Sequence, residues 1–296
     1  MAHEMVRLSE HVYYLPGSVN TTLIVGVEQA VIVDTGGDKD AGRRLKRACE
    51  SLQVTPVAVI NTHAHADHYG GNDFLVRNLG LPVYAPPFEA SILENPYFEP
   101  VYLFNGAKPP TELLSKWLMA KPSPVAHILA PGRLELAGLE LDIIDTSGHA
   151  HTHYAVGVGD VLIAADAVFG SVVLGRYPLP FGQDIGAQLG STARVAEVGA
   201  RVILPGHGEP TEDVQALVQA NLDAFARAAR VIETACTGVS TEAVLKVTAD
   251  TLNLEMRDLP RYYLNLCVVG AYLSYLRETG RVDLTLAENQ VRWTRA

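Results

Sequence analysis

The segment from Asn61 to His68 concentrates metal-binding chemistry more strongly than any other part of the chain. Three histidines and one aspartate, His63, His65, Asp67 and His68, occur there within six consecutive positions. Imidazole nitrogens and carboxylate oxygens are ligands for borderline divalent metals. His63 and His65 stand two residues apart on a nearly extended backbone and therefore point the same way. The two ligands that follow them diverge from this direction and suit a second metal.

Three further ligand-type residues occupy loops that follow predicted strands. His149 lies in Ser-Gly-His-Ala-His-Thr-His, Asp166 follows Ile-Ala-Ala, and His207 lies in Pro-Gly-His-Gly. Because the ends of strands can face one edge of a sheet system, these loops can meet the segment at 61–68. Seven ligands exceed the three or four that one ion needs, so the set predicts two metals that share a carboxylate bridge.

Alternating strands and helices have to position these loops. The apolar runs that predict strands are 11–15, 21–25, 30–33, 57–60, 81–85, 134–136, 139–144, 154–158, 161–165 and 201–204. Residues 39–53 have the spacing of a helix. Strands that alternate with helices, together with hairpins, predict an α/β protein with a mixed sheet system.

Residues 86–131 interrupt this alternation with proline pairs and helical stretches. They also carry several aromatic side chains: Tyr97, Phe98, Tyr102, Phe104 and Trp117. An insertion of this length usually covers a site as a lid or forms a subunit contact. The alternative is an ordinary helical hairpin whose aromatic residues belong to the core.

Residues 213–296 form a separate C-terminal region. Helices predicted over 212–236 and 261–278 precede a β hairpin over 280–293, which indicates a helical, winged-helix-like appendage to a catalytic domain at 1–212. The region holds nine Lys/Arg and ten Asp/Glu residues. This near-neutral charge argues against binding to duplex nucleic acid and favours a packing or dimerising module.

Composition indicates an ordinary globular protein. The 296 residues are 48% hydrophobic and 19% charged. No apolar run reaches the roughly 18 residues of a membrane span, and the first residues show no apolar signal core, so we expect a cytoplasmic protein. Cys49, Cys236 and Cys267 are few and far apart, which predicts reduced thiols and no disulfide framework.

The charge distribution restricts the partners. Of the net charge of −10, residues 1–212 carry −9, because residues 213–296 contribute only −1. Phosphate contacts need a basic face, so we expect a small-molecule substrate and no nucleic acid. Bound divalent cations would offset part of this acidity. The sequence leaves open whether the protein forms a homodimer.

Taken together, these residues resemble the metallo-β-lactamase superfamily over about 11–210. The resemblance implies an αββα sandwich with the metals at one edge between two sheets. It also implies the ligand sets: His63, His65 and His149 for one metal, Asp67, His68 and His207 for the other, and Asp166 as the bridge. Asp34, in Asp-Thr-Gly, matches the first motif of the superfamily, and we expect it to be a buried aspartate that bonds nearby loop amides.

The resemblance is strongest to glyoxalase II-type thioesterases. Lactamases of the cysteine-containing subclass place Cys at the position of Asp166 and usually Arg at that of His68. Quorum-signal lactonases typically place Tyr three residues after the bridging aspartate, where this chain has Phe169. The stretch Asp166-Ala-Val-Phe169, with Gly175-Arg176 following, is similar to that of glyoxalase II-type enzymes, with a spacing about one residue longer.

These observations predict a dinuclear metal-dependent hydrolase. Zinc is the expected metal, although iron and manganese accept the same ligands. A metal-bridging hydroxide would attack the carbonyl carbon of a thioester or ester, and Asp67 would orient it and carry its proton. His153 and Phe169 are expected beside the ligands, not among them. The alternatives are a mononuclear iron persulfide dioxygenase, an endoribonuclease, a lactonase and a non-enzymatic metal-binding scaffold.

Overall fold

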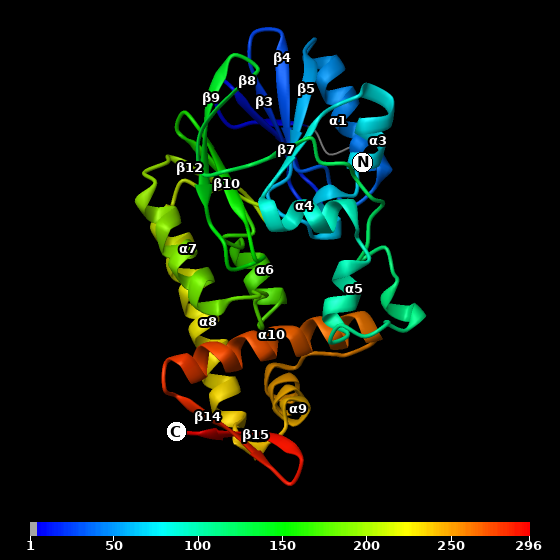
Figure 1. The fold of residues 1–296 in the computed structure, drawn as a ribbon. Helices are drawn as coiled ribbons and strands as arrows, with labels where there is room; N and C mark the ends of the chain where they lie inside the picture. The colour runs from blue at the N-terminus through cyan, green and yellow to red at the C-terminus, as the bar shows by residue number, and fades with distance from the viewer. Residues whose placement is uncertain (1–4) are drawn as a thin grey trace.

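Two β-sheets packed face to face form the body of the protein, whose computed structural model describes residues 5–296 (Figure 1). The first sheet contains, in spatial order, β1 (Val6–Arg7), β2 (Val12–Leu15), β3 (Thr21–Val25), β4 (Gln29–Val33), β5 (Thr55–Ile60), β6 (Val83–Ala85) and β7 (His127–Ile128). The second contains β12 (Val202–Pro205), β11 (Val161–Ala165), β10 (Tyr154–Val158), β9 (Leu139–Asp145) and β8 (Gly132–Leu136). The strands from β4 to β7 are parallel to one another, as are β11 and β12, and the remaining neighbours are antiparallel.

The central strands, such as β3, β10 and β11, are buried on both faces. Successive side chains of a strand point to opposite sides, so one set packs between the sheets and the other packs on the outer side. In β3, Ile24 belongs to the core between the sheets, together with Ile163 of the second sheet. Its neighbour Leu23 belongs to the cluster on the outer side, together with Leu45. Burial on both faces explains why the strands read as continuous apolar runs in the sequence.

Helices cover the outer faces and complete four layers. The first sheet packs against α1 (Lys39–Ser51) and α3 (Asn72–Leu79), and the second against α7 (Ile185–Glu197). Two short helices, α2 (Ala66–Tyr69) and α6 (Ser171–Arg176), lie in loops that carry ligand-type residues or follow them. The predicted αββα sandwich is thereby confirmed. No helix within residues 5–296 combines the length and the apolar character of a membrane span.

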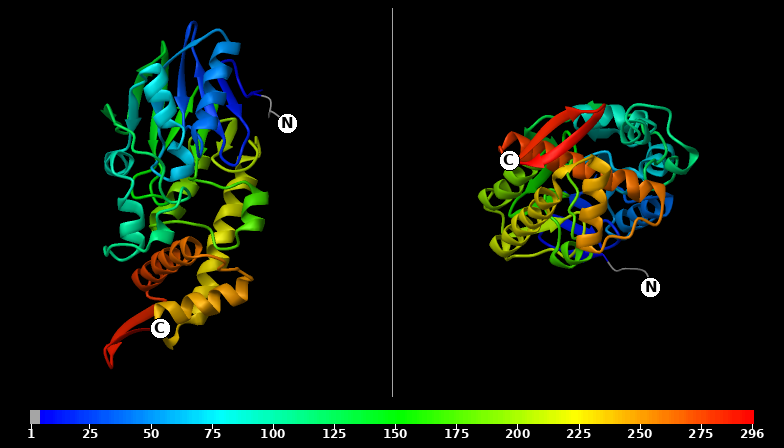
Figure 2. Two further views of the ribbon diagram at one scale, coloured as in Figure 1. Left: turned by 90° about the vertical axis from the view of Figure 1, so that its right-hand side faces the viewer. Right: turned by 90° about the horizontal axis from the view of Figure 1, so that it is seen from below.

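A helical region with a small sheet packs against one end of the sandwich (Figure 2). Its elements are, in chain order, α8 (Val214–Ala235), β13 (Thr237–Val239), α9 (Thr241–Leu252), α10 (Leu259–Glu278), β14 (Val282–Ala287) and β15 (Gln290–Arg295). Helix, strand, two helices and two strands follow one another as in a winged helix, and the small sheet has the order β13-β15-β14. Phe225 and Tyr272 of this region share one apolar cluster with Phe169 and Ile185. The C-terminal region therefore packs directly on the loop that follows β11.

The insertion at 86–131 connects the sandwich with the C-terminal region. It contains α4 (Pro87–Glu94), α5 (Phe98–Leu103) and a 3-10 helix, η1 (Thr111–Leu113). Helix α5 lies beside α10 (Figure 1), and the Phe104 ring lies 5.3 Å from that of Tyr263. Trp117, in contrast, is 73% exposed. The aromatic residues of the insertion are thus divided between an internal contact and positions that face solvent.

Gly70 fixes the position of α2 against the loop after β4. Its φ of −58° is ordinary for a helix, so the backbone conformation does not require glycine. A Cβ atom at this position would lie only 2.2 Å from the carbonyl carbon of Gly37. This close approach holds α2, which carries Asp67 and His68, at the edge of the first sheet.

We expect Gly70→Ala to lower the free energy of unfolding by about 1–3 kcal/mol, because the added methyl group overpacks this contact. Gly190→Ala is the matched control, since Gly190 lies inside α7 and no atom would lie within 4 Å of its Cβ. The control should stabilise the protein by about 0.5–1 kcal/mol. Chemical denaturation measures both, and equal stabilities of the two variants would contradict the packing argument.

Candidate metal centre

The predicted ligand residues come from four loops that converge at one edge of the two sheets. The loop after β5 leads directly into α2, and the other three loops follow β9, β11 and β12. Parallel pairing of β11 with β12 brings the loops after these two strands side by side. The structure places seven side chains together: His63, His65, Asp67, His68, His149, Asp166 and His207.

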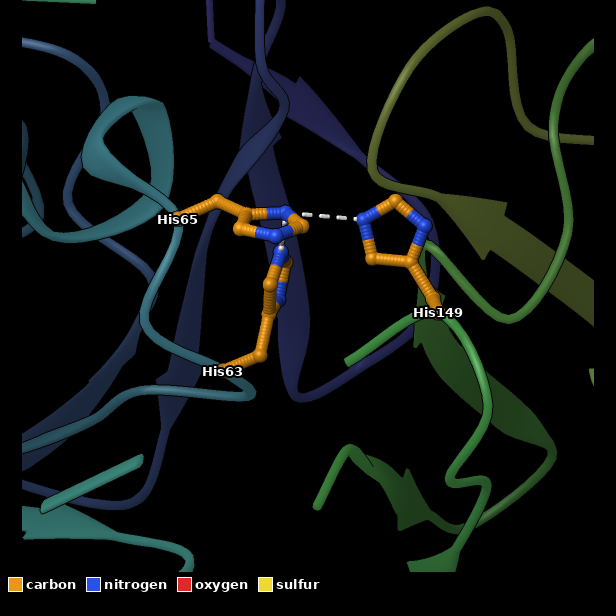
Figure 3. A group of neighbouring side chains, drawn as sticks. All are labelled: His63, His65 and His149. Atoms are coloured by element: carbon orange, nitrogen blue, oxygen red, sulfur yellow. Dashed lines mark hydrogen bonds between the residues drawn. The ribbon is translucent and has the colours of Figure 1, made fainter. Parts of the chain in front are cut away.

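Three imidazoles form the first ligand group (Figure 3). The Nε2 atom of His63 and the Nε2 atom of His149 lie 3.0 Å and 2.9 Å from Nδ1 of His65. A tetrahedral zinc ion with Zn–N distances of about 2.0–2.1 Å separates its ligands by roughly 3.3 Å. The triangle of nitrogens is therefore close to the size that such an ion requires.

Asp67, His68 and His207 form the second ligand group, and their ligand atoms lie within 4.8 Å of one another. The Nε2 atom of His207 is 3.6 Å from a carboxylate oxygen of Asp67. Asp67 and His68 are neighbours in the chain but differ in exposure: the Asp67 side chain is 43% exposed, whereas the His68 side chain is fully buried. The second group thus opens toward solvent on the Asp67 side.

Asp166 stands between the two groups. Its Oδ2 atom lies 3.2 Å from Nε2 of His149 and 3.4 Å from Nε2 of His207. Its Oδ1 atom lies 3.5 Å from Nε2 of His68, and both of these atoms are buried without a hydrogen-bond partner. Buried polar atoms are normally paired. Two unpaired ligand-type atoms that face each other fit a site built for a cation.

The first group presents neutral imidazoles. Burial lowers the pKa of His63 well below its usual value, and the neighbouring imidazoles lower it further. Burial also lowers the pKa of His65 to about 4 and the pKa of His149 well below its usual value. At neutral pH these rings are uncharged, which is the form in which imidazole nitrogens bind metals.

The second group and the bridge have the opposite electrostatics. Burial acts against a charge on His68, but the carboxylates of Asp166 and Asp34 raise its pKa well above the usual value. Burial acts against a charge on His207 as well, but the carboxylates of Asp166 and Asp67 together raise its pKa to about 9. Despite burial, these histidines hold the pKa of Asp166 well below its usual range. A divalent cation bound here would displace one proton, that on Nε2, from each of His68 and His207.

Asp34 orients His68 from behind. One of its carboxylate oxygens lies 2.7 Å from Nδ1 of His68 and accepts the Thr62 hydroxyl hydrogen at 2.9 Å. The other oxygen accepts the backbone N–H of Thr62 at 2.9 Å. Asp34 has a positive φ of 54° and is 2% exposed. It leaves Nε2 of His68 as the nitrogen that faces the ligand cluster, as a carboxylate behind a metal-binding histidine does.

His153 positions Asp166. Its Nε2 atom accepts the backbone N–H of Asp166 at 3.2 Å. The ring proton is then on Nδ1, which lies 2.8 Å from the Thr146 hydroxyl oxygen. Burial lowers the pKa of His153 to about 4, so the ring is neutral. The structure thus places His153 beside the ligands, with both nitrogens already occupied.

Phe169 links the ligand cluster to the C-terminal region. Its ring lies 5.6 Å from the ring of His149. Its backbone N–H donates to Oδ1 of Asn221 in α8 at 2.9 Å, and its carbonyl accepts from Nδ2 of the same side chain at 2.9 Å. One fully buried amide of the C-terminal region therefore fixes the loop that carries Asp166.

Glu89 of α4 joins two ligand loops. One of its carboxylate oxygens accepts the backbone N–H of Ala64 at 3.0 Å, and the other accepts that of Thr152 at 3.2 Å. Burial nevertheless raises its pKa to about 7. Sequence reasoning missed this residue, because a single glutamate in a helical insertion gives no sign of the loops that it will contact.

Two buried amides hold the remaining loops. Asn20 donates from Nδ2 to the carbonyls of Pro205 at 2.9 Å and Gly208 at 2.6 Å. These two carbonyls lie on either side of the ligand His207 in the loop after β12. Gln188 of α7 donates from Nε2 to the carbonyl of Ala167 at 3.0 Å. Sequence reasoning missed both residues and Asn221 as well. No spacing pattern marks them, since each contacts a segment far away in the chain.

Comparisons with known proteins agree with this geometry. A family model described as the metallo-beta-lactamase superfamily matches residues 14–207. A probable metallo-hydrolase of Bacillus subtilis is 26% identical over 157 residues, which cover 52% of this chain and 68% of that protein. The hydroxyacylglutathione hydrolase of Xylella fastidiosa is 31% identical over 150 residues, which cover 50% of this chain but only 44% of that enzyme.

Two solved structures resemble the whole chain. A metallo-beta-lactamase family protein from Thermus thermophilus has a TM-score of 0.75 and 23% identity, covering 98% of this chain and 100% of its own. A beta-lactamase domain protein from Burkholderia ambifaria has a TM-score of 0.72 and 19% identity, covering 100% of this chain and 94% of its own. At these identities the likeness shows the fold alone, and it extends through the C-terminal region.

We expect Asp34→Asn to weaken metal binding about 10–100-fold, because an amide cannot accept from both Thr62 and His68 as the carboxylate does. Metal content after dialysis against graded chelator concentrations measures the loss. Asp38→Asn is the control, since Asp38 caps α1 at the surface and asparagine caps helices equally well. Equal metal retention in the two variants would contradict the orienting role of Asp34.

We expect Asn221→Ala to lower the free energy of unfolding by about 1–3 kcal/mol, because the backbone N–H and carbonyl of Phe169 lose their partners. Urea denaturation provides the measurement. Asn78→Ala is the control, since the amide of Asn78 donates to a carbonyl at an exposed position. Its effect should stay within about 0.5 kcal/mol, and a similar small effect at Asn221 would count against the proposed link between α8 and the metal loop.

Proposed function

This chain belongs to the metallo-beta-lactamase superfamily, and we propose that it is a dinuclear metal-dependent hydrolase of thioester or ester bonds. The position of Asp166 carries the proposal, because its carboxylate lies within 3.5 Å of imidazole nitrogens from both ligand groups. A site for one ion would leave the second group without a role. Imidazole and carboxylate ligands suit zinc, with one ion in each group.

The residues around the cluster suit hydrolysis. Two cations held by these ligands would lower the pKa of a water from 15.7 toward about 7 and polarise a substrate carbonyl. The half-exposed carboxylate of Asp67 is the ligand nearest to solvent and is placed to accept the proton of the attacking water. The buried carboxylate of Asp34 keeps His68 in one orientation during this step.

The choice of a thioester or ester rests on the wall beside the first group. The Phe181 ring lies 5.2 Å from both the His65 ring and the His149 ring. Phe169 adds a second apolar ring and no hydroxyl that would assist a lactone carbonyl. These rings exclude water and suit an acyl group. The similarity to hydroxyacylglutathione hydrolase supports the reaction class, although it covers less than half of that enzyme.

Elemental analysis of the purified protein, followed by a panel of thioesters, lactones and RNA, tests the proposal. Two zinc ions per chain and turnover of thioesters or esters would support it. One iron ion would favour a dioxygenase, RNA cleavage would favour an endoribonuclease, and a protein without metal would favour a scaffold. Each of these other results would replace the proposed function.

We expect His207→Ala to lose one of two metal ions and to reduce kcat by roughly 100-fold or more, since half of the charge that acts on the reacting carbonyl is removed. Metal content and turnover are measured on the same preparation. His127→Ala serves as the control, because His127 of β7 stacks on Tyr84 of β6 and is not among the ligand groups. An unchanged rate for His207→Ala would rule out a dinuclear requirement.

A further inference from the structure

Glu99 is a buried carboxyl group that the proposed mechanism does not use. It lies in α5 of the insertion and is 3% exposed. Within residues 5–296, no side chain or backbone group donates a hydrogen bond to its carboxyl group, and no cation pairs with it. The two carboxyl oxygens therefore lack a partner, but they are not completely shielded from solvent. They open onto space that solvent can reach.

The groups around Glu99 are acidic or neutral. Burial raises the pKa of Glu99 well above its usual value, and the negative charges of Asp67 and Glu89 raise it further. Its own charge acts in turn on three groups from α2, α5 and α10, namely Tyr69, Tyr102 and Cys267. No lysine, arginine or histidine is among the groups that affect it.

Glu99 lies beside the loops that hold the metal cluster. Tyr102 follows it by three residues in α5, which places both side chains on one face of the helix. The Tyr102 oxygen accepts a hydrogen bond from Nε2 of Gln183 at 3.3 Å. The backbone N–H of Gln183 donates to the carbonyl of Gly148 at 2.8 Å, directly before the ligand His149. This face of α5 therefore borders the loops that hold the ligands.

A carboxyl group in such a place needs a partner from outside the chain. Buried carboxyl groups are normally paired, as Glu89 is by two backbone N–H groups. Glu99 has none, and its oxygens face open space. The negative charges of Asp67 and Glu89, which act on Glu99, would disfavour an anionic ligand here, whereas an ammonium group would supply hydrogen-bond donors and a positive charge. The charge of −9 on residues 1–212 also attracts cations.

We propose that the substrate carries a protonated amine on the side of the scissile bond that faces the insertion, and that Glu99 binds this amine. The inference rests on the proposed hydrolase function and narrows its substrates to thioesters or esters with a cationic group. Glu99 then acts as a specificity residue. No covalent bond to Glu99 forms or breaks.

Matched thioesters test the proposal by turnover. The zinc-loaded protein is compared on S-phenyl thioesters of 5-aminopentanoate, hexanoate and glutarate, which are similar in length and differ in end charge. We expect kcat/KM for the ammonium substrate to exceed that for the neutral one by about 10-fold or more, as for a charge-assisted hydrogen bond. Glu99→Gln should abolish this preference. Glu112→Gln, an exposed glutamate of the same insertion, should keep the preference.

Binding of thiol probes tests it without turnover. Calorimetry of the zinc-loaded protein compares ω-aminoalkanethiols of increasing chain length with alkanethiols of equal length. Wild type should bind the best amino probe about 10-fold or more tightly than the matched alkanethiol. Glu99→Gln should lose this preference while keeping its metal and its stability. Equal binding of the paired probes, or a preference that survives Glu99→Gln, would overturn the role of Glu99. Absence of all thioester and ester turnover would overturn the hydrolase proposal alone, because the binding comparison does not need turnover.

Discussion

A carboxylate sealed inside the protein is the constraint on which the rest of the structure depends. Asp166 is only 3% exposed, and a buried ionised carboxylate without compensation costs several kcal/mol. Compensation comes from imidazoles of three other loops and, once cations are bound, from the cations themselves. The approach is so close that a Cβ at Gly206 would lie 2.1 Å from Oδ1 of Asp166. The four loops therefore have to converge for this charge to be tolerated at all.

Neutral polar side chains hold the loops after β11 and β12 in place, whereas the carboxyl groups of Asp34 and Glu89 hold the loop after β5. His153 accepts the backbone N–H of Asp166, and Gln188 and Asn221 bond the loop after it. Asn20 does the same for the loop after β12. Neutral amides can satisfy buried backbone groups without altering the electrostatics of the ligands. The cluster has neutral imidazoles on one side and imidazoles with raised pKa values on the other, because the carboxylates of Asp166 and Asp34 act on His68 and those of Asp166 and Asp67 on His207.

The sequence predicted those parts of the site whose signals are local. Ligands at 63–68 lie within one loop, and the three other ligand loops each follow an apolar run that forms a buried strand, so strand ends and ligand types could be read directly. Asn221 and Glu89 could not be found in this way. Asn221 contacts a residue 52 positions away, and Glu89 contacts loops 25 and 63 positions away. Such contacts depend on how α8 and α4 pack, and periodicity does not report the packing of distant segments.

The ligands of the metal site and the parts of the protein that select the substrate also differ in this way, since the ligands are local in sequence and the selecting parts depend on distant packing. The ligands stand at the ends of strands in the sandwich, whereas the Phe169 and Phe181 rings beside them belong to the segment after β11, which packs on the C-terminal region. Helix α10 contributes to the apolar cluster beneath Phe169 and also contacts α5, which carries Glu99. A change in α10 can thus move both sides of the substrate space without touching a ligand. For this reason we expect the ligand set to define the reaction, and the packing of α5 against α10 to influence which substrates bind.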